Sequence, residues 1–592
     1  MTRKLRMAVA VLVPMGAGAL LVALGWHAVG GLLIFVALAA AVAYLLIVAR
    51  PARIAPDSLL RTRLSGTLRE HAATPLLERL RGGQAPTLHQ LREALQEAVG
   101  DPRVSAVMIE IAGLHCGLAS AQELHDLIGA LTAAGKRTVA VLEGDSLSAR
   151  EYLIAAAAGE IIANPDTTLA MVGLSAGGLF FKDALQRLQI DAQALQWKEY
   201  KGAAESFSRQ DMSAPLRQSI AEVLGDSERL MVEYVARARH LSAPAARAML
   251  TRGFVGAQAA CADKLIDRIG YSQEMLSNHG PNDKRVVGLT RYLRRVRWRK
   301  DRGKLPRIGL VFGVGPVLTG DEPLSGEFIS AVRTSAELLR AGRDERVKAV
   351  VFRVNSPGGA AVGSDLVWRA VKEVRGLGKP VVVSMGDVAG SGGYYVAAGA
   401  DAIVAQSATI TGSIGVVYVK FSIGALLRKL GVAADLVKMA PNGDAMSFTR
   451  ALDHDELQQL DQVMGELYGN FTAKVAEGRH LSAEQTEAVA KGRIWSGSAA
   501  LGNGLVDALG GLERAIAIAR EKAGLPPGQA LEVTIIGGGL GGLKAALMPN
   551  ASGAADGWPR WLAGLTGVPE AWLPALGMLC QGMALLSPWL LY

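Results

Sequence analysis

The body of this chain repeats itself once, and that internal repeat limits its fold more than any other feature. DPRVSAVMIEI from Asp101 matches DERVKAVVFRV from Asp344, and KLIDRIG from Lys264 matches GLVDALG from Gly504. The offset between the copies drifts only from 243 to 240 residues between these two matches. A period this long is the length of a whole domain rather than of a solenoid unit. The sequence therefore predicts two tandem copies of one domain.

Each copy has the pattern of an α/β domain. The β-branched runs at 349–354 and 381–384 predict buried strands, and the stretch 364–377 between them predicts a helix. Strands that alternate with helices favour a largely parallel sheet with crossover helices. We therefore expect a first α/β domain at residues 55–280 and a second at residues 305–530.

A long uncharged segment precedes the first copy. No residue from Met7 to Val48 carries a formal charge when His27 is counted as neutral. A signal peptide has an apolar core of only about 7–15 residues, whereas one membrane-spanning helix needs about 20. Residues 1–54 are therefore expected to anchor the protein in a membrane, as one helix or as a hairpin of two. Basic residues flank the segment on both sides, so the charge pattern does not decide on which side of the membrane the body of the protein lies.

Two other segments lie outside the copies. The run KRVVGLTRYLRRVRWRKDRGKLPR from Lys284 is strongly basic, in a chain of formal net charge +9. Basic runs can bind nucleic acid or anionic lipid, but aromatic residues that could stack on bases are scarce. We therefore predict a solvated basic linker at 281–304 and no nucleic-acid partner. Residues 531–592 are expected to hold a glycine-rich turn and an apolar tail, which could either dock on the protein or span the membrane.

The two copies differ where catalysis could arise. The second copy reads TGSIG around Ser413, where the first copy has Met171. Further on, the first copy has Lys201 where the second has Asn442. A serine hydroxyl needs an adjacent base to become a nucleophile, and a desolvated lysine can be that base. Because each copy lacks what the other supplies, we predict that Ser413 is the nucleophile and Lys201 the general base.

A glycine pair in the second copy is the candidate oxyanion hole. The run Asn355-Ser-Pro-Gly-Gly follows a predicted strand directly. Glycines let backbone N–H groups approach a reacting carbonyl closely, so Gly358 and Gly359 are the expected donors. The first copy has Ala112-Gly-Leu-His-Cys there, which is a poorer candidate.

Three other features receive structural interpretations. Ser391, in the run AGSGG, is a rival nucleophile, but the sequence comparison pairs it with Ser148, and a serine in both copies suggests a shared helix cap. The glycine run at 533–542 contains GxGxxG without the acidic residue that a dinucleotide site needs about 20 positions later. His454 is interpreted as a solvated residue at the start of a helix.

The chemistry is expected to need no metal and no cofactor. Cys116, Cys261 and Cys580 lie far apart and form no CxxC pair. The nine histidines show no metal-ligand spacing such as HExxH.

Several motifs together resemble signal peptide peptidase A in its long, duplicated form, a family also called protease IV. They are NSPGG at 355–359, SGGYY at 391–395, TGSIG at 411–415, GRIWSG at 492–497, Tyr200-Lys201 and Gly504-Leu-Val-Asp507. The resemblance implies two ClpP/crotonase-like domains and a Ser-Lys dyad shared between the halves, with Ser413 as nucleophile and Lys201 as base. It also implies a homotetramer at the bacterial inner membrane and the cleavage of leftover signal peptides.

The expected function is therefore that of a membrane-bound serine endopeptidase acting on signal peptides and similar apolar peptides. One alternative is a crotonase-type enzyme acting on acyl thioesters, because that fold class would be shared. It predicts glutamates at the active positions and no complementary serine and lysine. A second alternative is a catalytically silent membrane scaffold.

Overall fold

The computed structural model describes residues 53–71, 85–276, 283–300, 305–320, 327–537 and 590–591. The uncharged N-terminal segment lies outside these residues, and so does the C-terminal tail except for its strand at 590–591. Among the described residues, no helix combines the length and the apolar character needed to cross a bilayer.

The first copy is built on a six-stranded sheet in which every pairing is parallel. Its central strands are runs of Val, Ile and Leu that are buried on both faces, as parallel sheets require. Helices α4 (Leu88–Gly100), α5 (Leu118–Ala133) and α6 (Ala149–Ala156) supply much of the core that packs against the sheet. In order across the sheet, the strands are β10 (Arg268–Ile269), β5 (Glu160–Ala163), β3 (Arg137–Leu142), β2 (Val104–His115), β1 (Ser58–Thr67) and β11 (Val286–Gly288).

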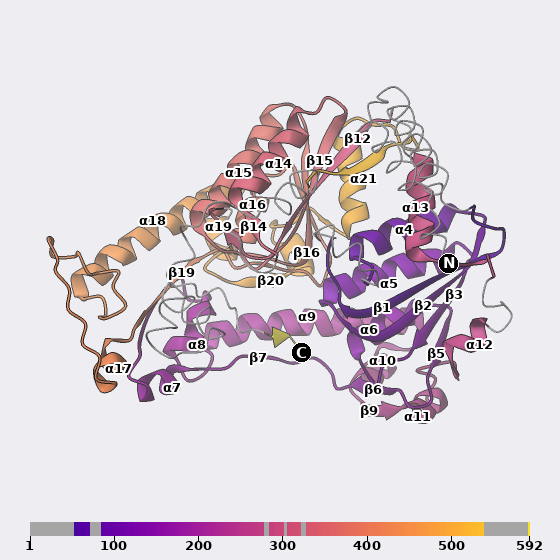
Figure 1. Cartoon of the computed structure of the whole chain (residues 1–592), viewed down its shortest axis with the longest axis horizontal. Coiled ribbons are helices and arrows are strands. Elements are labelled where there is room, and N and C mark those ends of the chain that lie inside the picture. Colours follow the sequence, from indigo (N-terminus) through magenta and orange to yellow (C-terminus); the bar gives the residue numbers. More distant parts are fainter. Residues whose placement is uncertain are drawn as a thin grey trace, which may run out of the picture.

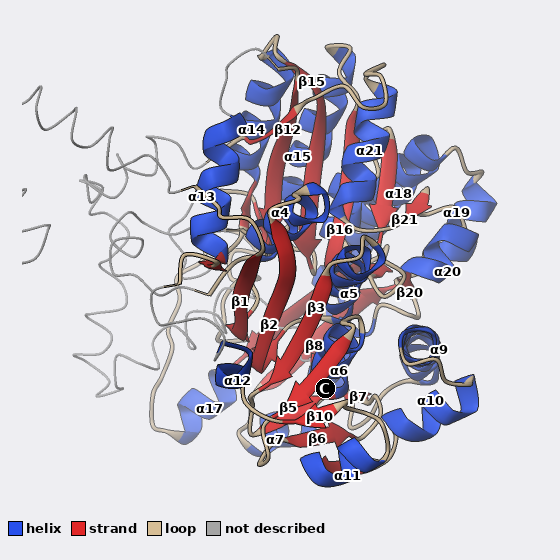
Figure 2. Cartoon of the chain, turned by 90° about the vertical axis from the view of Figure 1, so that its right-hand side faces the viewer, coloured by secondary structure: helices blue, strands red, loops and turns tan. Residues whose placement is uncertain are grey.

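The second copy has an eight-stranded sheet (Figures 1 and 2). Helices α14 (Ala331–Arg343) and α15 (Ala361–Gly376) cover one face, and α21 (Leu512–Lys522) covers the other. The main path runs β20 (Ile494–Ser496), β18 (Ile410–Gly412), β16 (Val381–Gly390), β15 (Val347–Ser356), β12 (Arg307–Val314) and β22 (Glu532–Ile535), while β17 (Ala402–Ala405) joins β16 to β21 (Ala508–Leu509). Six strands of this sheet repeat the order of the first sheet, from β21 through β17, β16, β15 and β12 to β22, and β18 and β20 are added beside β16. The prediction of a duplicated α/β protein with parallel sheets is confirmed.

One difference between the copies concerns the strand that leads to the site. In the second copy, β16 runs unbroken from Val381 to Gly390 and pairs with both β17 and β18. In the first copy the matching stretch is broken after Leu142. Its continuation, β4 (Ser146–Ser148), joins a separate three-stranded sheet with β6 (Thr168–Met171) and β9 (Gly253–Gly256).

The expectation of a solvated linker between the copies is wrong for residues 286–300. Strand β11 extends the first sheet by pairing with β1, and α13 (Leu289–Lys300) follows it directly. Tyr292, Leu293 and Val296 are buried in the first core, which leaves arginines such as Arg294 exposed. The basic run is thus an amphipathic helix, because its apolar residues recur at helical spacing.

One strand of each copy pairs with a strand of the other copy. Strand β8 (Asp191–Trp197) of the first copy pairs antiparallel with β19 (Val416–Ser422) of the second, from Trp197 opposite Val416 to Asp191 opposite Ser422. Figure 1 shows this ladder on the side of the molecule where the long helix α18 (His454–Arg479) also lies. The ladder carries a loop of the first copy to the second sheet.

A buried ion cluster also joins the copies. Arg353 on β15 is 1% exposed and bonds to Glu70 and Glu123 of the first copy, with nitrogen–oxygen distances of 3.0 to 3.1 Å. Glu70 also accepts a 3.3 Å hydrogen bond from the amide of Asn355. Removing one member of a buried pair costs about 3–5 kcal/mol, so these contacts hold the end of β15 in place.

Candidate active site

Lys201 reaches the second copy from the loop after β8. Its amine nitrogen lies 2.9 Å from Ser413 Oγ, 2.8 Å from the Ser413 carbonyl oxygen and 3.0 Å from Ser391 Oγ. The lysine comes from one copy and both serines come from the other. The meeting of Lys201 with Ser413 was expected from the differences between the copies, whereas the contact with Ser391 was not. The site is therefore made only when the copies are together.

The Lys201 side chain is buried, with 4% of its surface exposed. Burial lowers the pKa of its amine from 10.5 to about 7, because loss of water disfavours the charged form. Two glycines make room for it. A Cβ on Gly492 would fall 2.5 Å from Lys201 Cβ, and one on Gly415 would fall 3.1 Å from Lys201 Cδ. A useful fraction of this amine is thus neutral near pH 7, as a general base requires.

Ser391 stands at the junction between β16 and α16 (Gly392–Ala397). Its φ of 54° and ψ of −120° form a conformation that is costly for a residue with a side chain. Its hydroxyl makes no cap bond to the helix and lies instead by Lys201. By contrast, Ser148 has φ −76° and forms a full capping box with Glu151. The interpretation of Ser391 as a helix cap shared by both copies is wrong.

Strand pairing also corrects the alignment behind that interpretation. Ser148 pairs with Ala170, the residue before Met171, whereas Gly390 pairs with Gly412, the residue before Ser413. Ser148 is thus the structural counterpart of Gly390, and Ala149 is the counterpart of Ser391. The offset between the copies falls from 243 at Gly135 and Gly378 to 242 at Ala158 and Ala400. The one-residue shift therefore lies in the stretch where the first copy breaks between β3 and β4 while β16 is continuous.

Ser413 lies between β18 and β19. Its φ is 51°, and its N–H donates to the Arg493 carbonyl oxygen over 2.7 Å. Its counterpart Met171 is fully buried in the first copy. Both serine hydroxyls lie within hydrogen-bond reach of Lys201, so the assignment of Ser413 as the nucleophile stays a prediction. Asn442, which matches Lys201 in sequence, is exposed in a loop after α17 (Gly424–Lys429).

The predicted oxyanion glycines form a turn against Ser391. Gly358 has φ 111° and Gly359 has φ 153°. A Cβ on Gly358 would lie 2.6 Å from Ser391 Cβ and 2.8 Å from the nitrogen of Gly392, so only glycine permits this approach. The Gly358 N–H donates to Ser356 Oγ over 3.2 Å. Among the described residues, the N–H groups of Gly359 and Gly392 donate no hydrogen bond.

Other candidate positions prove to be structural. His454 is exposed in the first turn of α18, as predicted, and Cys116 and Cys261 are free thiols. In the described part of the chain, no cluster of His, Cys, Asp and Glu could hold a metal ion.

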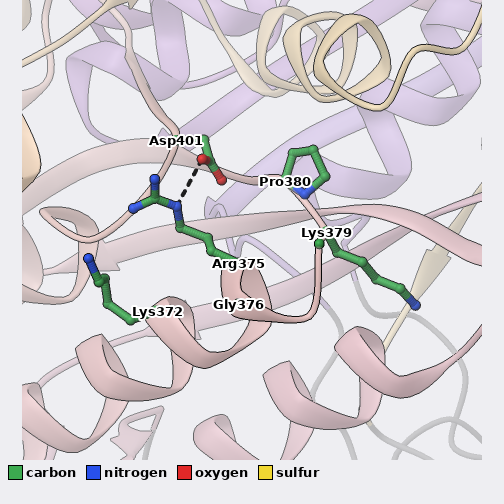
Figure 3. Close-up of a pocket in the computed structure, with 7 residues that line it drawn as sticks. Lys372, Arg375, Gly376, Lys379, Pro380 and Asp401 are labelled. Carbon is green, nitrogen blue, oxygen red and sulfur yellow. Dashed lines mark hydrogen bonds and ion pairs between the residues drawn. The ribbon is translucent and has the colours of Figure 1, made fainter.

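A cavity of about 460 Å³ lies beside the end of α15 and is lined by neither the lysine nor the serines of the site (Figure 3). Its Lys379 bonds to the Asp344 carbonyl as Lys136 does to that of Asp101, a structural contact common to both copies.

A buried lysine amine on a serine hydroxyl is the arrangement of serine hydrolases that use lysine as their base. Comparison with known proteins identifies the class. The model of "Peptidase family S49" matches residues 130–282 and again residues 373–526, one match in each copy. The chain belongs to peptidase family S49 and is a serine protease.

The relatives have the long, duplicated form. "Serine protease SPPA, chloroplastic" of Arabidopsis thaliana is 30% identical over 78% of this chain and 69% of its own length. "Protease 4" of Salmonella typhi is 30% identical over 75% of this chain and 73% of its own length. "Protease 4" of Haemophilus influenzae is 31% identical over 72% of this chain and 71% of its own length. The resemblance stated from the motifs is confirmed.

Proposed function

We propose that the chain cleaves peptide bonds with Lys201 as general base and Ser391 as nucleophile. The observation that carries this proposal is the buried amine of Lys201, 3.0 Å from Ser391 Oγ. In its neutral form the amine takes the hydroxyl proton as Oγ attacks the peptide carbonyl, and it then returns that proton to the leaving amine. Water then hydrolyses the acyl-enzyme with the same lysine as base.

Three observations favour Ser391 over Ser413, the first choice from sequence. Ser391 occupies a strained strand-to-helix turn, which resembles the nucleophile elbow of other hydrolases. The glycine turn lies against Ser391. The N–H that follows Ser391 belongs to Gly392 at the start of a helix, where such groups lack an intrahelical partner. Ser413 then serves to hold the lysine amine through its hydroxyl and carbonyl oxygens.

The oxyanion of the tetrahedral intermediate is proposed to bind N–H groups of this turn. Gly359 and Gly392 are the best donors because their N–H groups are not used elsewhere among the described residues. Gly358, also expected from sequence, supplies the close approach, since its N–H already donates to Ser356. Loss of one oxyanion donor typically costs about 10²–10³ in rate.

The proposed substrates are cleaved signal peptides and similar apolar peptides. A relative from Enterococcus faecium, 35% identical over 30% of this chain, is named "Putative signal peptide peptidase SppA". Membrane anchoring through residues 1–54 would place the site near such peptides. We keep the bacterial inner membrane as the proposed location, with the side of the membrane open. The ClpP/crotonase-like fold is the proposed fold of both copies, and the edge strands β11 and β22 extend them beyond the bounds 55–280 and 305–530 expected from sequence.

Pseudo-symmetry supports the proposed homotetramer. If the pairing of β8 with β19 were repeated between chains, residues 174–180 of one chain would pair with about 432–439 of the next. In this structure Ala176 and Gly177 pair instead with Leu591 and Leu590 of the same chain, so the contact between chains would have to replace that pairing. Both stretches are rich in exposed apolar side chains: Leu179 is 69% exposed, Val437 91% and Met439 96%. A head-to-tail contact gives a ring only when the rotation between neighbouring chains closes, and the proposed homotetramer is such a ring of four. Sedimentation should give a tetramer that Val437→Glu with Met439→Glu dissociates; a monomeric wild type would refute the assembly.

Hydrolysis of a fluorogenic peptide with a long apolar run tests the peptidase proposal. The full chain should cleave it, and both Ser391→Ala and Lys201→Met should abolish cleavage. Ser148→Ala is the matched control, because it removes a serine at the corresponding junction of the first copy. Cleavage that survives Lys201→Met would exclude the Ser-Lys mechanism. Turnover of an acyl thioester with no peptide cleavage would favour the crotonase alternative.

A further inference from the structure

Arg493 contacts both sides of the proposed site. Its carbonyl oxygen accepts the N–H of Ser413 over 2.7 Å. Its guanidinium lies 5.3 Å from the ring centre of Tyr200 and 4.2 Å from that of Trp495. Tyr200 directly precedes Lys201 in the chain. One residue of the second copy therefore touches both the loop that carries the amine and the strand end that carries Ser413.

The segment around Arg493 packs along the lysine loop. The N–H of Tyr200 donates to the Lys491 carbonyl over 3.1 Å, and the N–H of Gly492 donates to the Ile414 carbonyl over 2.7 Å. The close approach of Gly492 to the Lys201 backbone leaves no room for a side chain. These contacts shield the amine from water on that side.

Ion pairs between the copies surround the same loop, and each joins one residue of the first copy to one of the second. The charges in each pair are opposite, so these three pairs add no net charge beside the amine. The pairs are Lys198 with Glu487, Glu199 with Lys491, and Glu222 of α9 (Ala214–Ala238) with Arg493.

Arg493 holds this place at a cost in stability. Its Nε is buried and has no hydrogen-bond partner among the described residues, and leaving a buried donor unsatisfied is destabilising. Such a group in a folded protein calls for a reason. Stacking of the guanidinium on the two rings offsets this loss in part, but only while Tyr200 and Trp495 stay in place.

We propose that Arg493 is a positioning residue for the Ser-Lys reaction, holding the loop 198–201 so that Lys201 stays shielded from water and in reach of both serines. The inference rests on the proposed function. Among the described residues, the Lys201 amine has no carboxylate partner and bonds only to serine oxygens. Its place is therefore set by the loop that carries it, and the loop is held by Arg493.

Loosening the loop would change the pH dependence of the reaction, which the loss of a purely structural residue would not do. Water that reaches the amine would raise the Lys201 pKa from about 7 back toward 10.5. The neutral fraction at neutral pH would then fall. The rate would fall with it, and the pH at which the rate reaches half its maximum would rise.

The test measures the rate of labelling by a serine-directed fluorophosphonate against pH, with the full chain in detergent. Arg493→Met removes the cation and keeps the stem. Arg493→Lys keeps the charge but cannot stack as a planar group. The control is Lys372→Met, because Lys372 also pairs with a glutamate, Glu477, and lies over a tryptophan, Trp368, yet makes no contact with the lysine or serines of the site.

Arg493→Met should slow labelling about 10- to 100-fold at neutral pH and move the midpoint of its pH profile upward. Arg493→Lys should show a smaller shift in the same direction, and Lys372→Met should show none. An unchanged midpoint in Arg493→Met overturns the proposal even if the rate falls. If that variant does not fold, an unchanged midpoint in Arg493→Lys does so. Labelling of the wild type that persists in Lys201→Met would instead refute the proposed function.

Discussion

The same strand-to-helix junction serves different purposes in the two copies. In the first copy, Ser148 has an ordinary extended conformation and caps α6 through Glu151. In the second copy, Gly390 takes the place of Ser148, and Ser391 is turned to a positive φ with its hydroxyl on Lys201. At this junction the first copy has a stabilising helix cap, whereas the second copy has a strained backbone that places the Ser391 hydroxyl beside the Lys201 amine.

The lysine loops differ in the complementary sense. In the first copy the loop after β8 is pinned against the second sheet and buries Lys201. In the second copy the matching stretch around Asn442 is exposed and pairs with no strand of its own chain among the described residues. Each copy thus keeps one half of the site.

Removing either half of the site should give the largest effect. Lys201→Met or Ser391→Ala is expected to lower peptide hydrolysis by about 10⁴-fold or more, as loss of a catalytic group does in other serine hydrolases. Initial rates on the fluorogenic peptide measure this loss. Asn442→Lys in the Lys201→Met background is the control, and it should restore nothing because that loop lies in the wrong copy.

The pH dependence should follow the buried amine. Because only neutral Lys201 can accept a proton, the rate should fall about tenfold for each pH unit below its pKa of about 7, and it should level off above that value. Single-turnover acylation measured against pH gives this curve. A rate that keeps rising through pH 10 would mean that Lys201 has the pKa of an exposed lysine.

Ser413→Ala should have an intermediate effect if this serine only holds the lysine. Loss of the 2.9 Å contact to the amine is expected to lower the rate about 10- to 100-fold, the usual range for a supporting hydrogen bond. Labelling by fluorophosphonate should persist at a reduced rate. Complete loss of labelling in Ser413→Ala, with labelling retained in Ser391→Ala, would restore Ser413 as the nucleophile.

Ser148→Ala should have the smallest catalytic effect. Losing a capping box costs about 1 kcal/mol in the free energy of unfolding, which chemical denaturation can measure. Peptide hydrolysis should stay within about twofold of the wild type, because this serine touches no residue of the site. A large loss of activity at unchanged stability would contradict the division of labour between the copies.

Sequence reasoning predicted the repeat, the parallel sheets and the meeting of Lys201 with the second copy. The repeat was readable because identical residues recur at a nearly constant offset. Sequence reasoning interpreted Ser391 as a cap for a local reason: the offset slips by one residue where β3 breaks and β16 continues, so a constant offset aligns Ser391 with Ser148 rather than with Ala149. Positive φ at Ser391 and the approach of Gly358 depend on contacts between distant segments, so no local pattern could reveal them.

The basic run is the second place where sequence reasoning fell short. Its charges suggested a solvated linker, yet Tyr292, Leu293 and Val296 fall on one helical face and are buried. Helical spacing within the run was the signal that could have found α13.

Mapping of a fluorophosphonate adduct tests the central claim most directly. The full chain would be labelled at neutral pH, digested, and the modified residue located by mass spectrometry, with Lys201→Met as the control. The account predicts one adduct, on Ser391, that is absent from the control. An adduct on Ser413, on a serine of the first copy, or on Ser391 in the absence of Lys201 would contradict it.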